Sequence, residues 1–260
     1  RFLRSHLLLP TYPRLLHDNV ESKSAFWTGI EAYCRRRLLV RISVNSYEAP
    51  DADIPGLSDI TWSSSRSEYY IDLRPELDVI LKNFSSNHRR NIKKGQKQGF
   101  TRSISQSEAS LQAHLAAFSH TAARRQNRNE SIPGVNEQRL RMLLESENAF
   151  MMQLHLNEEI VSSMFIITTD KSAFYYSGGT TVGGTKMGAF QYLIWLAVGE
   201  LKSRGITTMT LGGTDADTPE GLRRFKLGFN AREVSLMHYE YLEGIAPLKF
   251  ALKLQRGLRR

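Results

Sequence analysis

A glycine-rich stretch at residues 177–189, SGGTTVGGTKMGA, has the residue types of an anion-binding turn. It follows a β-rich run and precedes a helical pattern, so we expect it to join a strand to a helix. Glycines let backbone N–H groups turn toward an anion, and a helix N-terminus adds partial positive charge. The order of residues does not match a P-loop, and the glycine spacing does not match a dinucleotide-binding turn. The stretch predicts either an anion site of another kind or a set of tight turns.

A second stretch is strongly basic: Arg89, Arg90, Lys93, Lys94 and Lys97 fall within about two helical turns. Like charges at i and i+4 repel one another unless an anion or an acidic neighbour offsets them. The stretch is therefore either a solvated helical face or a phosphate-binding ridge that acts by charge neutralisation. Aromatic residues are not interleaved with these cations, which argues against sequence-specific recognition of single strands.

Carboxylates follow a predicted strand end in TDADTPE, at Asp215 and Asp217. They are candidates for acid–base work, and equally for stabilising the N-terminus of the next helix. The sequence has no H-E-x-x-H, G-x-S-x-G or paired C-x-x-C motif, so no metal site is expected. Cys34, the single cysteine, lies on the apolar face of a predicted helix, which favours a small buried side chain over a nucleophile.

Composition limits the classes of function. The chain has 260 residues, is 41% hydrophobic and carries a net charge of +9, so we expect a folded protein with an anionic partner. One cysteine excludes an internal disulfide framework and favours a reducing, cytoplasmic setting. The longest apolar runs, such as YLIWLAV at 192–198, are too short to span a bilayer. The sequence begins at Arg1, so we expect that residues precede it and that its first half is incomplete.

Periodicity and turn residues predict alternating helices and strands. The expected elements up to residue 144 are a helix around 26–33, strands at 38–44 and 68–73, one long helix over 77–99, a strand at 101–105, a helix capped by Ser107, a polar loop at 123–134 and a helix around 140–144. Three β-rich runs then predict an antiparallel meander. After it come a helix around 193–201 ended by Gly205, a strand at 206–213, a helix with Thr218 as N-cap and Pro219 as its first residue, and a strand at 232–242.

This order of elements resembles the GNAT acyltransferase fold. Three motifs narrow the resemblance: NHRRNIKKGQKQGF at 87–100, LGGT at 211–214 and FKLGFN at 225–230. Together they resemble the FemABX family of peptidoglycan-bridge aminoacyltransferases and their FemAB-like relatives, most clearly over residues 75–242. The resemblance implies an α/β (α+β) fold with a mixed, largely antiparallel sheet flanked by helices. It also implies a partial N-terminal GNAT-like half at 1–75, an acyltransferase domain at 76–246 and a basic C-terminal helix at 247–260.

The resemblance assigns the basic FKLGF segment to the transfer site. It implies that Lys226 is catalytic at the acyl-donor end, and Gly228 would let the backbone approach a bound chain. Asp215, named above for its place after a strand end, is the second catalytic candidate. The alternative is an ordinary helix C-terminus, with Gly228 as its stop and Phe225 in the core. The implied donor-binding residues are Tyr175, Ser177, Gly178, Gly179, Gly183, Gly184, Phe225 and Gly228. The implied anion-binding residues are Arg89, Arg90, Lys93, Lys94, Arg223 and Arg224.

The function implied is N-acyl transfer: an acyl or aminoacyl group passes from acyl-CoA or aminoacyl-tRNA to an amine, with a peptidoglycan precursor as one acceptor. A non-catalytic RNA- or anion-binding module on the same fold is the alternative. The terminal segment PLKFALKLQRGLRR at 247–260 is either a helix docked on the protein or an interfacial helix that contacts an anionic membrane.

Overall fold

The computed structural model describes residues 6–9, 15–17, 19–37, 39, 41–46, 56–57, 60–128, 134–215 and 218–242. Asp217 and the expected helix at 247–260 lie outside these residues. The chain divides into two compact units, one made of Arg1–Ser67 with Val234–Arg260 and the other of Glu68–Glu233. The predicted domain boundaries at residues 75 and 246 stay a prediction.

The first unit has a small core around one helix. Its elements are β1 (His6–Leu9), α1 (Val20–Arg36) and β2 (Arg41–Asn45), with most of β9 (Arg232–Leu242). β1 pairs with β2 in parallel, and β2 pairs with β9 antiparallel. Trp27 and Cys34 stand two turns apart on α1 and are buried with Ile42 and Tyr241. Cys34 is thus a core side chain, as predicted.

The strands form a nine-stranded sheet in the order β1-β2-β9-β3-β8-β7-β6-β5-β4. The remaining strands are β3 (Ile60–Asp72), β4 (Thr101–Ser105), β5 (Ala149–Leu156), β6 (Glu159–Thr168), β7 (Ser172–Thr180) and β8 (Thr208–Asp215). β4, β5, β6 and β7 are antiparallel neighbours, whereas β7 and β8 run parallel. The mixed, largely antiparallel sheet expected from the sequence is confirmed.

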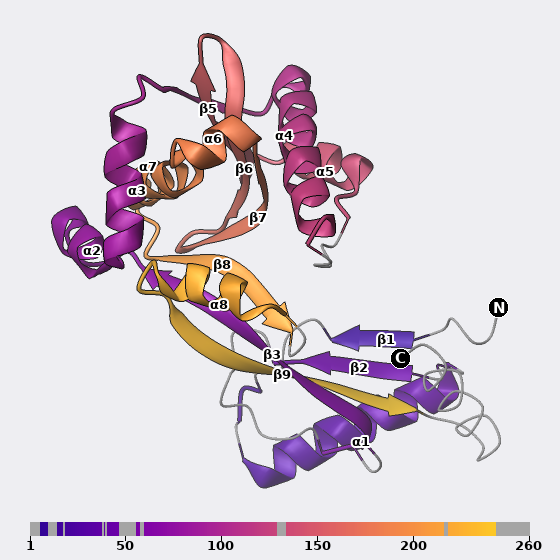
Figure 1. Ribbon diagram of the computed structural model, residues 1–260. Helices are drawn as coiled ribbons and strands as arrows, with labels where there is room; N and C mark the ends of the chain where they lie inside the picture. Colours follow the sequence, from indigo (N-terminus) through magenta and orange to yellow (C-terminus); the bar gives the residue numbers. More distant parts are fainter. Residues whose placement is uncertain are drawn as a thin grey trace. The chain divides into compact units, whose positions relative to one another are not determined.

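Helices cover both faces of the meander in the second unit (Figure 1). α4 (Glu108–Gln126) and α5 (Glu137–Leu144) share a core with Met151 and Phe165, on one face. α7 (Ala189–Ser203) packs against Met152 and Met164, the next residues along the same strands, on the other face. The alternation follows from the two-residue period of a strand, and it explains why consecutive residues of β5 and β6 are buried.

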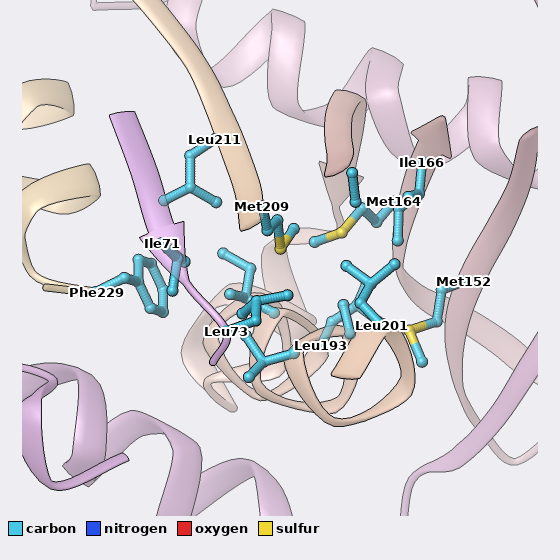
Figure 2. Packing of buried hydrophobic residues seen from close by; sticks show 14 of the residues in the cluster. Ile71, Leu73, Met152, Met164, Ile166, Leu193, Leu201, Met209, Leu211 and Phe229 are labelled. Carbon is cyan, nitrogen blue, oxygen red and sulfur yellow. The ribbon is translucent and has the colours of Figure 1, made fainter. Parts of the chain in front are cut away.

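The larger core lies between α7 and the strands (Figure 2). Leu193 and Leu201 of α7 point toward Met152, Met164 and Met209, and all five side chains are fully buried. A fully buried side chain of this size stabilises the fold by about 1.5–3 kcal/mol, so this layer fixes α7 on the sheet.

The expected long helix over 77–99 is wrong, because it is broken into α2 (Leu77–Asn83) and α3 (Ser86–Gln96). Ser85 is the N-cap of α3: its side chain accepts a hydrogen bond from the backbone N–H of His88. Arg89 donates to the carbonyl oxygens of Lys82 and Phe84, which the end of α2 leaves without helical partners. Serine side chains compete for backbone groups in this way, and that competition outweighs the continuous apolar stripe.

The glycine-rich stretch at 177–189 leads from a strand to a helix, as expected, but most of it belongs to these elements and not to a loop. Gly178 and Gly179 belong to β7, Gly183 and Gly184 lie in the short helix α6 (Val182–Lys186), and Gly188 with φ of 75° turns the chain into α7. A smaller correction concerns α8 (Glu220–Leu227), whose N-cap position is Pro219 rather than Thr218. No helix in the described ranges is both long and apolar enough to cross a membrane.

Candidate active site

The parallel strands β7 and β8 separate part-way along their length. Their paired residues run only from Ser172 with Thr208 to Phe174 with Thr210, although both strands continue for several residues. On its other side β7 carries an extra residue, since Phe165 faces Ser177 while Ile166 faces Tyr175. A bulge of this kind bends a strand and increases its twist. The backbone of β7 beyond Phe174 is therefore turned away from β8, and space opens between the strands.

A cavity of about 670 Å³ occupies this region. β7 contributes its second half, from Tyr175 to Thr180, and the other walls come from α4, α7, α8 and Leu211 of β8. The charged residues of its described lining are Arg124, Arg125, Arg128 and Lys226, and this described lining contains no aspartate or glutamate. The cavity is thus chemically suited to a ligand with negative charge.

Two of the cations, Arg124 and Arg125, come from the last turn of α4, and Arg128 directly follows the C-cap of this helix. Arg124 donates to the hydroxyl of Thr185 at 2.8 Å. The hydroxyl of Thr121 accepts a hydrogen bond from the backbone N–H of Thr180, which fastens this end of α4 to the end of β7. Residues 123–134 are a polar loop in the sequence-based expectation, so Arg124 and Arg125 were missed. The arginines follow Thr121 at i+3, i+4 and i+7, which is the spacing of one helical face. This spacing was the signal in the sequence that could have placed them together on the cavity side.

Lys226 enters the cavity from the opposite side, on α8. Only 6% of its surface is exposed. Its ammonium group donates to the carbonyl oxygen of Gly213 at 2.8 Å and lies 5.1 Å from the ring centroid of Tyr69. The Tyr69 hydroxyl in turn contacts Thr214 and donates to Glu233. The LGGT motif of β8 and the FKLGF motif of α8 therefore meet at this lysine.

Comparison with known proteins gives the family of this arrangement. The model of the acetyltransferase (GNAT) domain family matches residues 82–227, which is more than half of the chain and contains the whole described cavity lining. The chain belongs to this family. It is an acyltransferase with a GNAT fold, as the sequence resemblance predicted. A search of curated proteins finds no match.

Solved structures share the fold of this GNAT protein at low sequence identity. FemX matches with a TM-score of 0.66 and 12% identity, over 86% of this chain and 77% of FemX. The C-terminal domain of a putative lysylphosphatidylglycerol synthetase from Agrobacterium fabrum matches with a TM-score of 0.57 and 16% identity, over 90% and 78%. L-PGS from Bacillus licheniformis matches with a TM-score of 0.56 and 14% identity, over 91% and 79%.

The GNAT cavity brings together six of the predicted site residues: Tyr175, Ser177, Gly178, Gly179, Phe225 and Lys226. Ser177 is hydrogen-bonded to the buried imidazole of His114 at 2.9 Å. Burial raises the pKa of the Tyr175 phenol and lowers the pKa of His114 to about 4, so both groups are neutral near pH 7. The side chain of Asp215 lies outside the described residues, although its backbone ends β8.

The other predicted glycines, Gly183, Gly184 and Gly228, lie outside the described lining, and the last two have close packing contacts. A Cβ on Gly184 would lie 2.5 Å from the carbonyl oxygen of Val161. A Cβ on Gly228 would lie 2.6 Å from Nε2 of His88, which binds the carbonyl oxygen of Phe225 at 2.8 Å. Gly228 therefore allows α3 and α8 to approach each other closely. A Cβ on Gly183 would have no neighbour closer than 3.9 Å.

The six predicted anion-binding residues also lie outside the described lining. Arg89 is bound to backbone carbonyls of α2, and Arg90 donates to the side chain of Asn87. Arg223 pairs with Glu233 at 2.7 Å and with Glu220. Lys93, Lys94 and Arg224 are exposed. The described part of the chain has no group of three or more His, Cys, Asp or Glu side chains placed to hold a metal ion.

Proposed function

We propose that this protein transfers an acyl or aminoacyl group from a phosphate-bearing donor to an amine in the cavity between β7 and β8. The observation that carries the proposal is the combination of separated parallel strands, three arginines and a buried lysine in one space. A phosphate-bearing donor has an anionic end for the arginines and a reactive carbonyl that must come close to a stabilising group.

The donor lies along β7 in this proposal. Beyond Phe174 the strand no longer pairs with β8, so its backbone can bind an extended ligand arm in place of a strand. The phosphates face Arg124, Arg125 and Arg128, because guanidinium groups bind phosphate oxygens through two parallel hydrogen bonds. The acyl carbon then lies toward Lys226 and Ser177.

The reaction is direct transfer. The amine nitrogen of the acceptor attacks the acyl carbon, and a carbon–nitrogen bond forms while the bond from that carbon to the donor sulfur or oxygen breaks. One amine proton ends on the departing sulfur or oxygen. Negative charge develops on the carbonyl oxygen in between, and the ammonium group of the buried Lys226 stabilises it. Asp215 stays a predicted acid–base group.

Two donors have this chemistry: acyl-CoA, whose reactive bond is a thioester, and aminoacyl-tRNA, whose reactive bond is an ester. A peptidoglycan precursor is the candidate acceptor that the FemABX resemblance implies. The test is calorimetric titration of acetyl-CoA and, separately, of charged tRNA into the purified protein at moderate salt. Micromolar binding of acetyl-CoA together with amide formation supports the thioester, and binding and turnover with charged tRNA alone support the ester.

Two double variants locate the anion site. Arg124→Ala with Arg128→Ala removes two cavity cations, whereas Arg90→Ala with Lys94→Ala removes two cations of α3. The proposal expects the first pair to weaken donor binding at least tenfold and the second pair to change it less than threefold. The reverse result would move the anion site to α3, as the basic stretch of sequence predicted.

The alternative is a binding module that holds RNA or another anion in the same cavity without chemistry. The positive charge supports both functions equally. They differ in turnover, since a pure binding module forms no amide with either donor. Contact of residues 247–260 with an anionic membrane is a separate prediction, tested by liposome sedimentation of an Arg256→Ala, Arg259→Ala, Arg260→Ala variant.

A further inference from the structure

Four polar side chains from four different elements form a hydrogen-bonded chain that ends at Ser177 in the cavity lining. Gln153 of β5, Ser163 of β6, His114 of α4 and Ser177 of β7 are each less than 10% exposed. Ser163 Oγ lies 2.8 Å from Nδ1 of His114, and Ser177 Oγ lies 2.9 Å from Nε2 of the same ring. The His114 ring is fully buried and lies edge-on to Phe165, so burying it without these bonds would be costly.

The hydrogen bonds of this chain have a fixed direction, and Gln153 sets it. Its amide nitrogen lies 2.8 Å from the carbonyl oxygen of Ser110, which can only accept, so the NH₂ group and not the amide oxygen faces that side. The same nitrogen lies 3.1 Å from Ser163 Oγ and donates to it. Within the described residues Ser163 Oγ has these two side-chain partners, Gln153 and His114. Its own proton is therefore donated to Nδ1 of His114.

The direction carries on through the imidazole. A neutral ring that accepts at Nδ1 carries its proton at Nε2, so His114 donates to Ser177 Oγ. The opposite tautomer would leave the buried hydroxyl proton of Ser163 facing two donors. Burial keeps the ring neutral near pH 7, because it lowers the pKa of His114 to about 4. The oxygen of Ser177 is then an acceptor within the chain, and its proton is left for another partner.

A ligand in the cavity can supply that partner. Ser177 is part of the described lining, near the bulge of β7, and Lys226 belongs to the same lining. We propose that Ser177 is a catalytic residue that donates a hydrogen bond to the acyl carbonyl oxygen, and that His114, Ser163 and Gln153 are positioning residues that hold its proton in the cavity. This inference rests on the proposed acyl transfer. No bond to Ser177 is made or broken, because the hydroxyl only stabilises the charge that develops on that oxygen.

The first experiment tests the orientation without any turnover. Long-range ¹H–¹⁵N spectra of the histidine side chains report which ring nitrogen carries the proton, and the His114→Gln variant identifies the signal of His114. The inference expects protonation at Nε2 in the wild-type protein at pH 7 and a partial shift to Nδ1 in Ser163→Ala. Protonation at Nδ1 in the wild-type protein overturns it.

The second experiment measures kcat and donor affinity. Ser177→Ala is expected to lower kcat about 10²- to 10³-fold, the usual effect of losing one oxyanion donor, with donor affinity within threefold of wild type. Ser163→Ala should lower kcat in the wild-type background and should have no further effect in Ser177→Ala, because it acts through that hydroxyl. Ser162→Ala is the matched control, because it removes the buried hydroxyl next to Ser163 on β6. That hydroxyl has Gly179 and Thr180 as partners, and its loss should leave kcat unchanged.

The outcomes separate the two proposals. Turnover by the wild-type protein with kcat retained in Ser177→Ala overturns the role of Ser177 and leaves the acyl transfer standing. Full additivity of Ser163→Ala and Ser177→Ala overturns the positioning chain. Absence of amide formation by the wild-type protein with both acyl-CoA and charged tRNA overturns the proposed function and this inference with it.

Discussion

Gly179 of β7 lies directly against the backbone of Ala117 in α4. A Cβ added at Gly179 would overlap the carbonyl group of Ala117 and the amide nitrogen of Phe118. Backbone atoms inside a helix cannot move aside as a flexible side chain can. This contact sets how closely the helix that carries the cavity arginines lies on the strand that lines the cavity.

Replacing Gly179 by alanine should therefore destabilise the protein by about 3 kcal/mol or more, because overpacking forces the backbone to shift. Urea unfolding with a constant m value measures this change. Gly183→Ala is the matched control, since its nearest neighbour is 3.9 Å away and the helix α6 favours alanine over glycine by up to about 1 kcal/mol. Equal effects of the two substitutions would contradict the close contact.

Lys226→Met tests the lysine of the FKLGF motif. The substitution keeps the length of the side chain but removes the charge, so kcat should fall about 10²-fold or more while donor affinity changes only a few-fold. Lys82→Met is the control, because Lys82 is exposed and lies outside the described cavity lining. This variant should behave as wild type. Thermal unfolding of both variants checks the fold. Unchanged kcat in Lys226→Met would exclude a catalytic role for this ammonium group.

Several features were predictable from the sequence because local patterns dictate them. The meander follows from three β-rich runs with turn residues between them, and α7 ends before Gly205, whose φ of 78° favours glycine. A motif predicted Lys226 as a site residue, and Lys226 is part of the described cavity lining. These signals need only neighbouring residues along the chain.

Other features depend on contacts distant in sequence. The break between α2 and α3 rests on Ser85 and Arg89 binding backbone groups, which a stripe of apolar residues does not reveal. Gly179 and Gly184 belong to a stretch whose composition is typical of an anion-binding turn. In the structure each of these glycines allows a close contact with the backbone of another element. The network of His114 joins residues up to 63 positions apart. No spacing in the sequence indicates that these side chains meet.

Gly228 and His88 form a further pair that can be tested. A Cβ at Gly228 would lie 2.6 Å from Nε2 of His88, so Gly228→Ala should destabilise the protein by about 1–3 kcal/mol. In a His88→Ala background the same substitution should destabilise the protein much less, because the imidazole that the new Cβ would overlap is absent. Urea unfolding of the four proteins gives the coupling. An unchanged cost in that background would show that the contact with His88 is not the cause of the destabilisation.

The stability of the protein should fall as the pH is lowered from 7 toward 4.5, and His114 should contribute a defined part of the loss. Burial lowers its pKa from 6.5 to about 4 in the folded protein, so the unfolded chain takes up a proton over this range before the folded protein does. The stabilisation is complete above pH 6.5 and is lost as the pH falls toward 4. Among the described residues the ring contacts two serine hydroxyls and Phe165, and none of these contacts carries a charge that would offset the effect.

The pKa difference corresponds to a loss of about 2–3 kcal/mol between pH 7 and pH 4.5 from His114 alone. Burial also lowers the pKa of His88, which acts in the same direction. Urea unfolding of wild type and His114→Gln at both pH values isolates the contribution, because the carboxylates titrate in both proteins. The variant starts less stable, since it loses buried hydrogen bonds, but its stability should change with pH by about 2–3 kcal/mol less. Equal pH dependence in the two proteins would mean that His114 is not held neutral by burial.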